Sequence, residues 1–127
     1  MSIDTIVGAT HGRTARLGIR EIVRQLNTAL GPTLVAALAG AKDPKISHRW
    51  ARTDGPEPRD EAQARLILAH RAWQLVSEVE GEHVARLWFV GANPHLGEVS
   101  PIEAISQNRA SEVISAATAM IEDGFAG

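Results

Sequence analysis

Cysteine is absent from the 127-residue sequence, and so is tyrosine. Without cysteine there is no disulfide framework, no thiolate metal site and no cysteine nucleophile. Long apolar runs are also missing, since the longest, Leu34–Ala41, is far too short to span a bilayer. Residues 1–18 show no extended apolar core and no signal-cleavage pattern. We therefore expect a cytoplasmic protein without a membrane partner.

Motifs of enzymatic chemistry are lacking as well. The sequence holds no glycine-rich phosphate loop, no Gly-x-Ser-x-Gly elbow and no His-Glu-x-x-His helix. The histidines lie far apart without helical ligand spacing, so we expect surface or packing roles and no metal site. A carboxylate dyad built from distant residues stays open as an alternative, but no motif proposes one. The sequence thus favours a binding protein over an enzyme and implies no cofactor.

The composition favours packed helices. Apolar residues make up 44% of the chain and charged residues 22%, and the apolar set is mostly Ala, Leu, Ile and Val. Apolar side chains recur at three- and four-residue spacing, which predicts an all-α fold of at most seven helices. We expect helices over residues 19–30, 33–39, 45–52, 60–79, 82–90, 101–108 and 110–122. Residues 1–18 lack a clear period and are predicted to be a partly disordered, flexible N-terminus.

The charges are distributed unevenly along the chain. Residues 9–72 contain eleven Lys and Arg against six Asp and Glu, a net charge of +5. Residues 81–127 contain two Arg against six acids, a net charge of −4. A basic front part suits a polyanion such as nucleic acid. Solvated helix faces that merely segregate by charge are the alternative interpretation.

A helix-turn-helix pattern lies within this basic part, from Thr33 to Arg52. Two short predicted helices are joined by a turn at Gly40 and Asp43-Pro44, and the second is polar and basic. Trp50 and Ile46 would anchor that second helix, whose outward side chains would read the major groove or contact phosphates. The expected DNA contacts are Lys45, Ser47, His48, Arg49 and Arg52. A plain helical hairpin is the alternative.

The back part, residues 81–127, contains residues typical of helix starts and helix ends. Ser100 and Glu103 fit a capping box with Pro101 at the first helical position. Gly124 is expected to stop the last helix. Trp88 is expected in the core, and Phe89, its neighbour, is expected to be an exposed anchor for a protein partner.

These motifs resemble the Xre/MbcA/ParS antitoxin family over roughly Ile19 to the end of the chain. The similarity rests on a tryptophan before an Asn-Pro-x-Leu-Gly-like loop, a proline-led helix, a final helix that ends at a glycine, and an upstream Arg-Trp pair. The residues that carry it are Arg49, Trp50, Trp88, Asn93, Pro94, Leu96, Gly97, Pro101 and Gly124.

The resemblance implies an antitoxin of a type II toxin-antitoxin system. Such a protein would inhibit a RES-domain, NAD-degrading toxin by blocking its active site, and would bind its operator DNA to repress its own operon. It implies a DNA-binding domain over residues 19–80 and a toxin-binding domain over 81–127, which with the toxin would form a larger hetero-oligomer. A homodimer is also expected, since proteins that read the major groove usually pair to bind two half-sites. The implied toxin contacts are Phe89, Asn93, Glu122, Asp123, Gly124, Phe125, Ala126 and Gly127.

Two alternatives remain at this point. The chain could be a stand-alone helix-turn-helix transcriptional regulator without a toxin, with a back part that serves dimerisation. The last residues could equally be a frayed end without a role.

Overall fold

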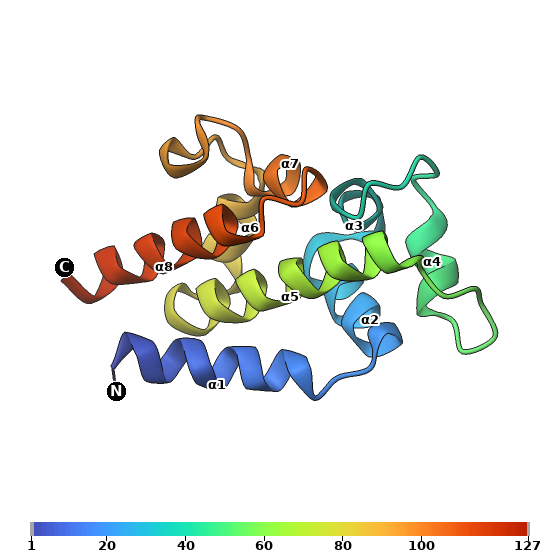
Figure 1. The fold of residues 1–127 in the computed structure, drawn as a ribbon, viewed down its shortest axis with the longest axis horizontal. Coiled ribbons are helices and arrows are strands. Elements are labelled where there is room, and N and C mark those ends of the chain that lie inside the picture. The colour runs from blue at the N-terminus through green and yellow to red at the C-terminus, as the bar shows by residue number, and fades with distance from the viewer. Residues whose placement is uncertain (1, 127) are drawn as a thin grey trace.

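A computed structural model describes the backbone of residues 2–126 and the side chains of residues 2–123. Over this range the chain is all-α, as predicted, with eight α-helices, one 3-10 helix and no strand (Figure 1). No described helix combines the length and the apolarity needed to cross a membrane. The elements are α1 Ile3–Ala15, α2 Ile19–Leu30, α3 Pro32–Leu38, α4 Ile46–Ala51, α5 Asp60–Glu80, α6 Glu82–Val90, η1 Pro94–Leu96, α7 Pro101–Ser106 and α8 Ala110–Ala126.

The long helix α5 runs through the middle of the molecule. Its buried positions lie on more than one side, because α1, α2, α6 and α8 all pack against it (Figure 1). The pattern of the sequence predicted this, since apolar residues fill two neighbouring stripes. The buried residues of α5 are Leu66, Leu68, Ala69, His70, Ala72, Trp73, Leu75 and Val76.

The predicted flexible N-terminus is wrong for residues 3–15, which form α1. Ser2 begins this helix by accepting a hydrogen bond from the backbone N–H of Thr5 at 3.1 Å. The helix packs on α5 through Ile6, Thr10 and Thr14, which are all buried. Two of these three are threonines, so hydropathy shows no apolar period. The helix count therefore exceeds the expected seven by this one element.

The two predicted parts share one core. A single cluster of buried apolar residues extends from Ile6 in α1 to Ile121 in α8, and it includes Val23, Leu66 and Phe89. Gly81, the predicted joint, ends α5 and begins α6 with a φ of +88°, a conformation that glycine adopts without strain. The chain therefore turns sharply here without leaving the common core.

His70 joins three helices inside this core. Its Nδ1 lies 2.7 Å from the hydroxyl of Thr14 in α1, and its Nε2 lies 2.7 Å from Oε1 of Gln25 in α2. Because Gln25 Oε1 only accepts, Nε2 carries the proton and Nδ1 accepts from the threonine. Burial lowers the pKa of His70 from 6.5 to about 4, so the ring is neutral at pH 7. The interpretation of the histidines as packing residues holds here.

The first prediction concerns acid stability. The unfolded chain protonates His70 near pH 6.5 and the folded chain only near pH 4, so the free energy of unfolding falls as the pH drops through this window. His70→Gln keeps polar partners for Thr14 and Gln25 without titrating. Between pH 7 and pH 5 the variant should lose about 2 kcal/mol less stability than the wild type in urea unfolding.

The matched control is His83→Gln on the exposed start of α6. It should leave the pH dependence of unfolding as it is in the wild type. Equal slopes for His70→Gln and the wild type would mean that the buried ring does not control acid stability.

Candidate functional site

The helix pair α3 and α4 packs against α2 at one end of the molecule (Figure 1). Pro32 stands at the start of α3, and Gly40 adopts a φ of +78° just after its end. In the connection, the carboxylate of Asp43 accepts a hydrogen bond from the backbone N–H of Lys45 at 2.9 Å. Trp50 is buried and Ile46 half-buried, so both hold α4 to the core as the sequence predicted.

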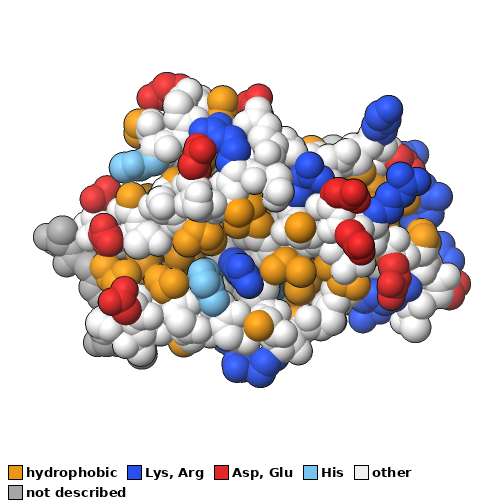
Figure 2. Space-filling model, in the orientation of Figure 1, with side chains coloured by type: hydrophobic (Ala, Val, Ile, Leu, Met, Phe, Trp, Pro, Cys, Tyr) orange, Lys and Arg blue, Asp and Glu red, His pale blue; other side chains and the backbone are white. Residues whose placement is uncertain are grey.

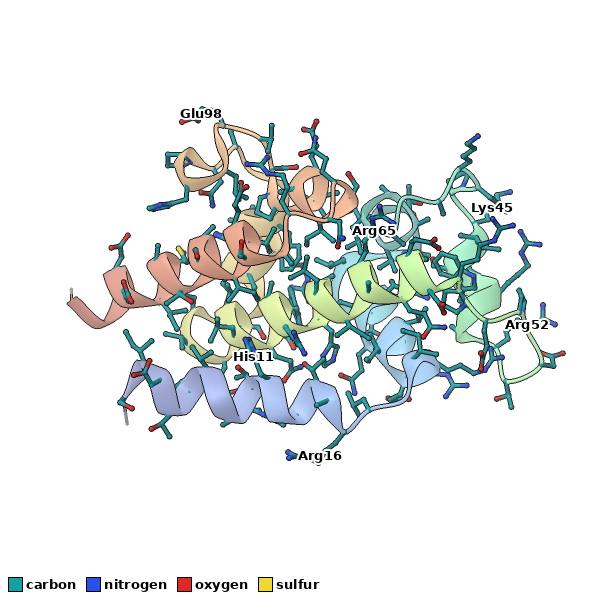
Figure 3. The ribbon with its side chains drawn as sticks, viewed as in Figure 1. His11, Arg16, Lys45, Arg52, Arg65 and Glu98 are labelled. Atoms are coloured by element: carbon teal, nitrogen blue, oxygen red, sulfur yellow. The ribbon has the colours of Figure 1, made fainter. Side chains whose placement is uncertain are left out.

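Four of the five predicted DNA contacts lie on the surface of this end. Lys45, His48, Arg49 and Arg52 are exposed, and Figure 3 shows Lys45 and Arg52 pointing outward there. The structure corrects the fifth. Ser47 is fully buried, and its hydroxyl donates to the backbone carbonyl of Pro32 at 2.8 Å, which ties α4 to the start of α3.

Two of the exposed arginines are paired within their own segment. Arg49 forms a salt bridge with Asp43, and Arg52 forms one with Asp54 at 3.1 Å. The backbone N–H of Lys45, and then Arg49, lower the pKa of Asp43, while the hydrogen bond and charge of Arg52 lower that of Asp54. Asp54 in turn raises the pKa of Arg52. Figure 2 shows this mixture of cationic and acidic side chains at the α4 end of the molecule.

Two arginines of α2 bind the far end of α4, a role that the sequence analysis missed. Arg20 donates to the carbonyls of Trp50 at 3.1 Å and Gly55 at 2.7 Å, and also to that of Arg52. Arg24 donates to the carbonyl of Ala51 at 2.8 Å. These groups satisfy carbonyls that a helix leaves without partners and complement the negative end of its dipole. The only feature of the sequence that could have indicated this role is the four-residue spacing of Arg20 and Arg24, which places both on one face of α2.

A groove of about 630 Å³ lies between the α3–α4 connection and the start of α5. Trp50 and Ile46 line its apolar part. Its charged lining carries both signs, from Lys42, Arg59, Arg65, Glu57 and Glu61. The volume falls in the range of small-molecule sites, but the mixed charges select no single class of ligand.

The predicted loop of the back part closes around Asn93, which is buried. Its side-chain oxygen accepts from the N–H of His95 at 2.9 Å, and its carbonyl accepts from the N–H groups of Leu96 and Glu98 at 2.9 Å. Its own N–H donates to the carbonyl of Val99 at 3.1 Å. Asn93 therefore caps the 3-10 helix with its side chain and closes the loop with its backbone.

The other residues of this segment also shape the turn between α6 and α7. Leu96 is buried, and Gly97 turns the chain with a φ of +67°. Pro94 begins η1 and is exposed, whereas Pro101 begins α7 and is buried. The predicted cap of α7 is present, because the hydroxyl of Ser100 accepts from the N–H of Glu103 at 3.2 Å.

The expected positions of two aromatic residues on α6 are corrected. Phe89, predicted to be an exposed anchor, is fully buried, with its ring 6.1 Å from that of Trp73. Trp88, predicted to lie in the core, is half-buried and meets Phe89 edge-on at 5.1 Å. The large exposed apolar side chains of this helix are Leu87 and Val90. Adjacent aromatics on a helix face different ways, and the sequence alone did not tell which one points inward.

The last helix is longer than expected. It continues to Ala126, past the predicted end at Glu122, so Gly124 does not stop it. Ile121 is buried in the core, while Glu122 and Asp123 are exposed where α8 reaches the edge of the molecule (Figure 1). The side chains of the other predicted toxin contacts, Gly124 to Gly127, lie outside the described part of the chain.

Among residues with described positions, no three His, Asp or Glu side chains gather closely enough to hold a metal ion. Comparison with known proteins gives no relative: no family model, no curated protein and no solved structure matches the chain.

The second prediction concerns Gly55, which lies where the backbone after α4 turns back on itself. A Cβ at this position would meet the carbonyl oxygen of Arg49 at 1.9 Å and that of Arg52 at 3.3 Å. Gly55→Ala should therefore push apart the end of α4 and the loop that Arg20 holds. We expect a loss of about 1–3 kcal/mol in the free energy of unfolding, measured by urea titration.

Gly8→Ala supplies the control, since nothing lies within 4 Å of a Cβ at this position in α1. The same substitution here should stabilise the protein by up to about 1 kcal/mol. A Gly55→Ala protein as stable as the wild type would show that the loop adapts without cost.

Proposed function

We propose that this chain is an antitoxin: a binding protein, not an enzyme, that captures and inhibits a RES-domain, NAD-degrading toxin and represses its own operon. The observation that carries the proposal is the closed loop around Asn93. Five of the residues on which the family resemblance rests build this loop and the start of the next helix, namely Asn93, Pro94, Leu96, Gly97 and Pro101. Asn93 accepts and donates the closing bonds, Leu96 fills the core, and Pro101 begins the next helix.

The toxin-binding part of the proposal uses the outer end of α8. Glu122 and Asp123 are exposed there and form an acidic pair beside Gly124-Phe125-Ala126-Gly127. A site that binds NAD must hold phosphates, and the cationic groups that do so also attract carboxylates. We therefore propose that this acidic end enters the toxin's nucleotide site and blocks it.

The DNA-binding part uses α3 and α4 as a helix-turn-helix unit. Support comes from the exposure of Lys45, His48, Arg49 and Arg52 on one end of the molecule. Exposed ion pairs contribute little to stability, so a phosphate can displace Asp43 from Arg49 or Asp54 from Arg52. Lys45 has no salt-bridge partner among the described residues, which leaves it available to a duplex.

A stand-alone transcriptional regulator remains the second candidate. The shared core favours it, since α6, α7 and α8 pack with α5 and complete the same folded unit as α2 to α4. In that case the back part would stabilise the DNA-binding unit. Purification together with the protein encoded beside this gene separates the two, because only an antitoxin captures a RES-domain partner.

The third prediction tests capture of the toxin. Glu122→Gln with Asp123→Asn removes two exposed charges from the end of α8 without touching the buried Ile121. Co-expressed with the toxin, this variant should rescue growth and cellular NAD⁺ less well than the wild type. A loss of two charge-assisted hydrogen bonds should weaken the complex by at least about tenfold.

An equivalent change at the start of α5, Asp60→Asn with Glu61→Gln, removes a matched adjacent acidic pair that is also exposed. It should leave rescue intact. If both double variants protect cells as well as the wild type does, the acidic end of α8 is not the inhibitory segment.

The fourth prediction tests DNA binding. Lys45→Ala with Arg49→Ala should weaken binding to a duplex from the region upstream of the gene. The logarithm of the binding constant should also depend less steeply on salt, by about 0.9 per lost phosphate contact. Fluorescence anisotropy over a salt series measures both effects.

Arg16→Ala is the control, because Arg16 is exposed and points away from the α4 end (Figure 3). It should leave the affinity and the salt slope unchanged. Equal effects of the two variants would indicate a diffuse charge effect and would argue against α4 as the DNA-binding element.

A further inference from the structure

A small pocket lies where the end of α1 meets α2 and α5. Its volume of about 320 Å³ is at the lower end of the range of small-molecule sites. Six of the described residues line it, and none of the six is Asp or Glu: Arg13, Arg16, Leu17, Gln25, His70 and Gln74. The groove beside α4, in contrast, is lined by charges of both signs. This pocket, termed the α1 pocket below, therefore presents cationic and amide groups without a carboxylate among them.

Arg13 and Arg16 supply the positive charge from the end of α1. They are three residues apart, so their side chains lie on the same side of the helix. The guanidinium of Arg16 folds back along α1, since its Nη1 would lie 3.5 Å from a Cβ at Gly12. Arg13 has an exposed partner in Glu78 at 3.4 Å, whereas Arg16 forms no ion pair with any described residue. One carboxylate thus balances two neighbouring cations.

The inner wall of the α1 pocket is held in place by His70. The ring Nε2 donates to Oε1 of Gln25, which keeps the acceptor end of that amide on the ring and leaves its nitrogen as a donor. That nitrogen has only a long bond, of 3.4 Å, to Glu21. Gln74, half-buried on α5, adds a second amide, which bonds to none of the described residues. Since the ring of His70 is neutral at pH 7, the wall offers donors without a negative charge.

We propose that the α1 pocket binds the phosphate group of a small phosphorylated molecule. A phosphate monoester carries close to two negative charges at pH 7 and three strong acceptor oxygens, so it can accept from Arg13, Arg16 and Gln74 at once. A carboxylate has one charge and two oxygens, and it would leave one cation unbalanced. Because Arg16 is exposed to water, the dissociation constant should be about 0.1–10 mM. The proposal needs neither toxin nor duplex, so it stands or falls apart from the proposed function.

Isothermal titration calorimetry with inorganic phosphate, at constant ionic strength in chloride buffer, measures the binding. Arg16→Gln removes one cation and should raise the dissociation constant at least about tenfold, the effect of losing a charge-assisted hydrogen bond. Arg59→Gln is the matched control, because Arg59 is also exposed and also has no ion pair with a described residue, but lies outside the pocket. It should leave the constant unchanged. Thermal melts of both variants in chloride should match the wild type, since neither side chain is buried.

Gln74→Glu and acetate test the charge and the shape of the ligand. Gln74→Glu keeps the size of the side chain but places a carboxylate among the donors, so phosphate should bind at least about tenfold more weakly. Acetate should bind the wild type at least about tenfold more weakly than phosphate, because it carries a single charge. A wild type without measurable binding up to about 50 mM phosphate, or equal losses in Arg16→Gln and Arg59→Gln, overturns the proposal. Acetate that binds as tightly as phosphate assigns the pocket to a carboxylate and overturns it as well.

A phosphate group also occurs in nucleic-acid backbones, and two further ligands distinguish the sources. Glycerol 3-phosphate should bind at least as tightly as inorganic phosphate, because the pocket has room for a small organic group. A duplex of random sequence should bind Arg16→Gln as tightly as the wild type in fluorescence anisotropy. Weaker duplex binding by Arg16→Gln would assign the α1 pocket to nucleic acid, and exclusion of the ester would restrict it to the free ion; either result contradicts the proposal.

Discussion

Burial of α5 on more than one side is the constraint on which the rest of the structure depends. A helix with water on one face needs a single apolar stripe, but α5 has neighbours on several sides, and eight of the eleven residues from Leu66 to Val76 are apolar. His70 is the one polar residue among the buried residues of α5; burial keeps its ring neutral, and α1 and α2 supply hydrogen-bond partners for both ring nitrogens. Because the neighbouring helices all pack against α5, their buried side chains join in one core.

This arrangement separates the two candidate surfaces along the length of α5. The α4 end lies beside the start of α5, while the outer end of α8 lies at the opposite edge of the molecule (Figure 1). A ligand at one end would not cover the other, so the proposed duplex and the proposed toxin would not compete for one surface. Any influence between them must pass through α5 and the helices packed on it, because these elements share one core.

The sequence predicted those features that depend on local chemistry. Apolar periodicity located α2 and α5, and the Ser100 cap with Pro101 located the start of α7. Prediction from the sequence failed where a residue's partner lies far away in the chain. Two of the three buried residues of α1 are threonines, and one of them bonds to His70, so the sequence of this helix shows no apolar period. Ser47 looked like a surface residue because its partner, the carbonyl of Pro32, became visible only in the structure.

Arginine illustrates most clearly why charge counted along a sequence differs from charge on a surface. The excess of +5 over residues 9–72 includes Arg20 and Arg24, whose donors are directed to backbone carbonyls in the last turn of α4 and just after it. It also includes Arg49 and Arg52, whose charges are partly balanced by Asp43 and Asp54. A duplex that approaches α4 would therefore meet a weaker field than the count implies. Binding there must depend on the exchange of carboxylate for phosphate at individual arginines, which makes geometry more important than total charge.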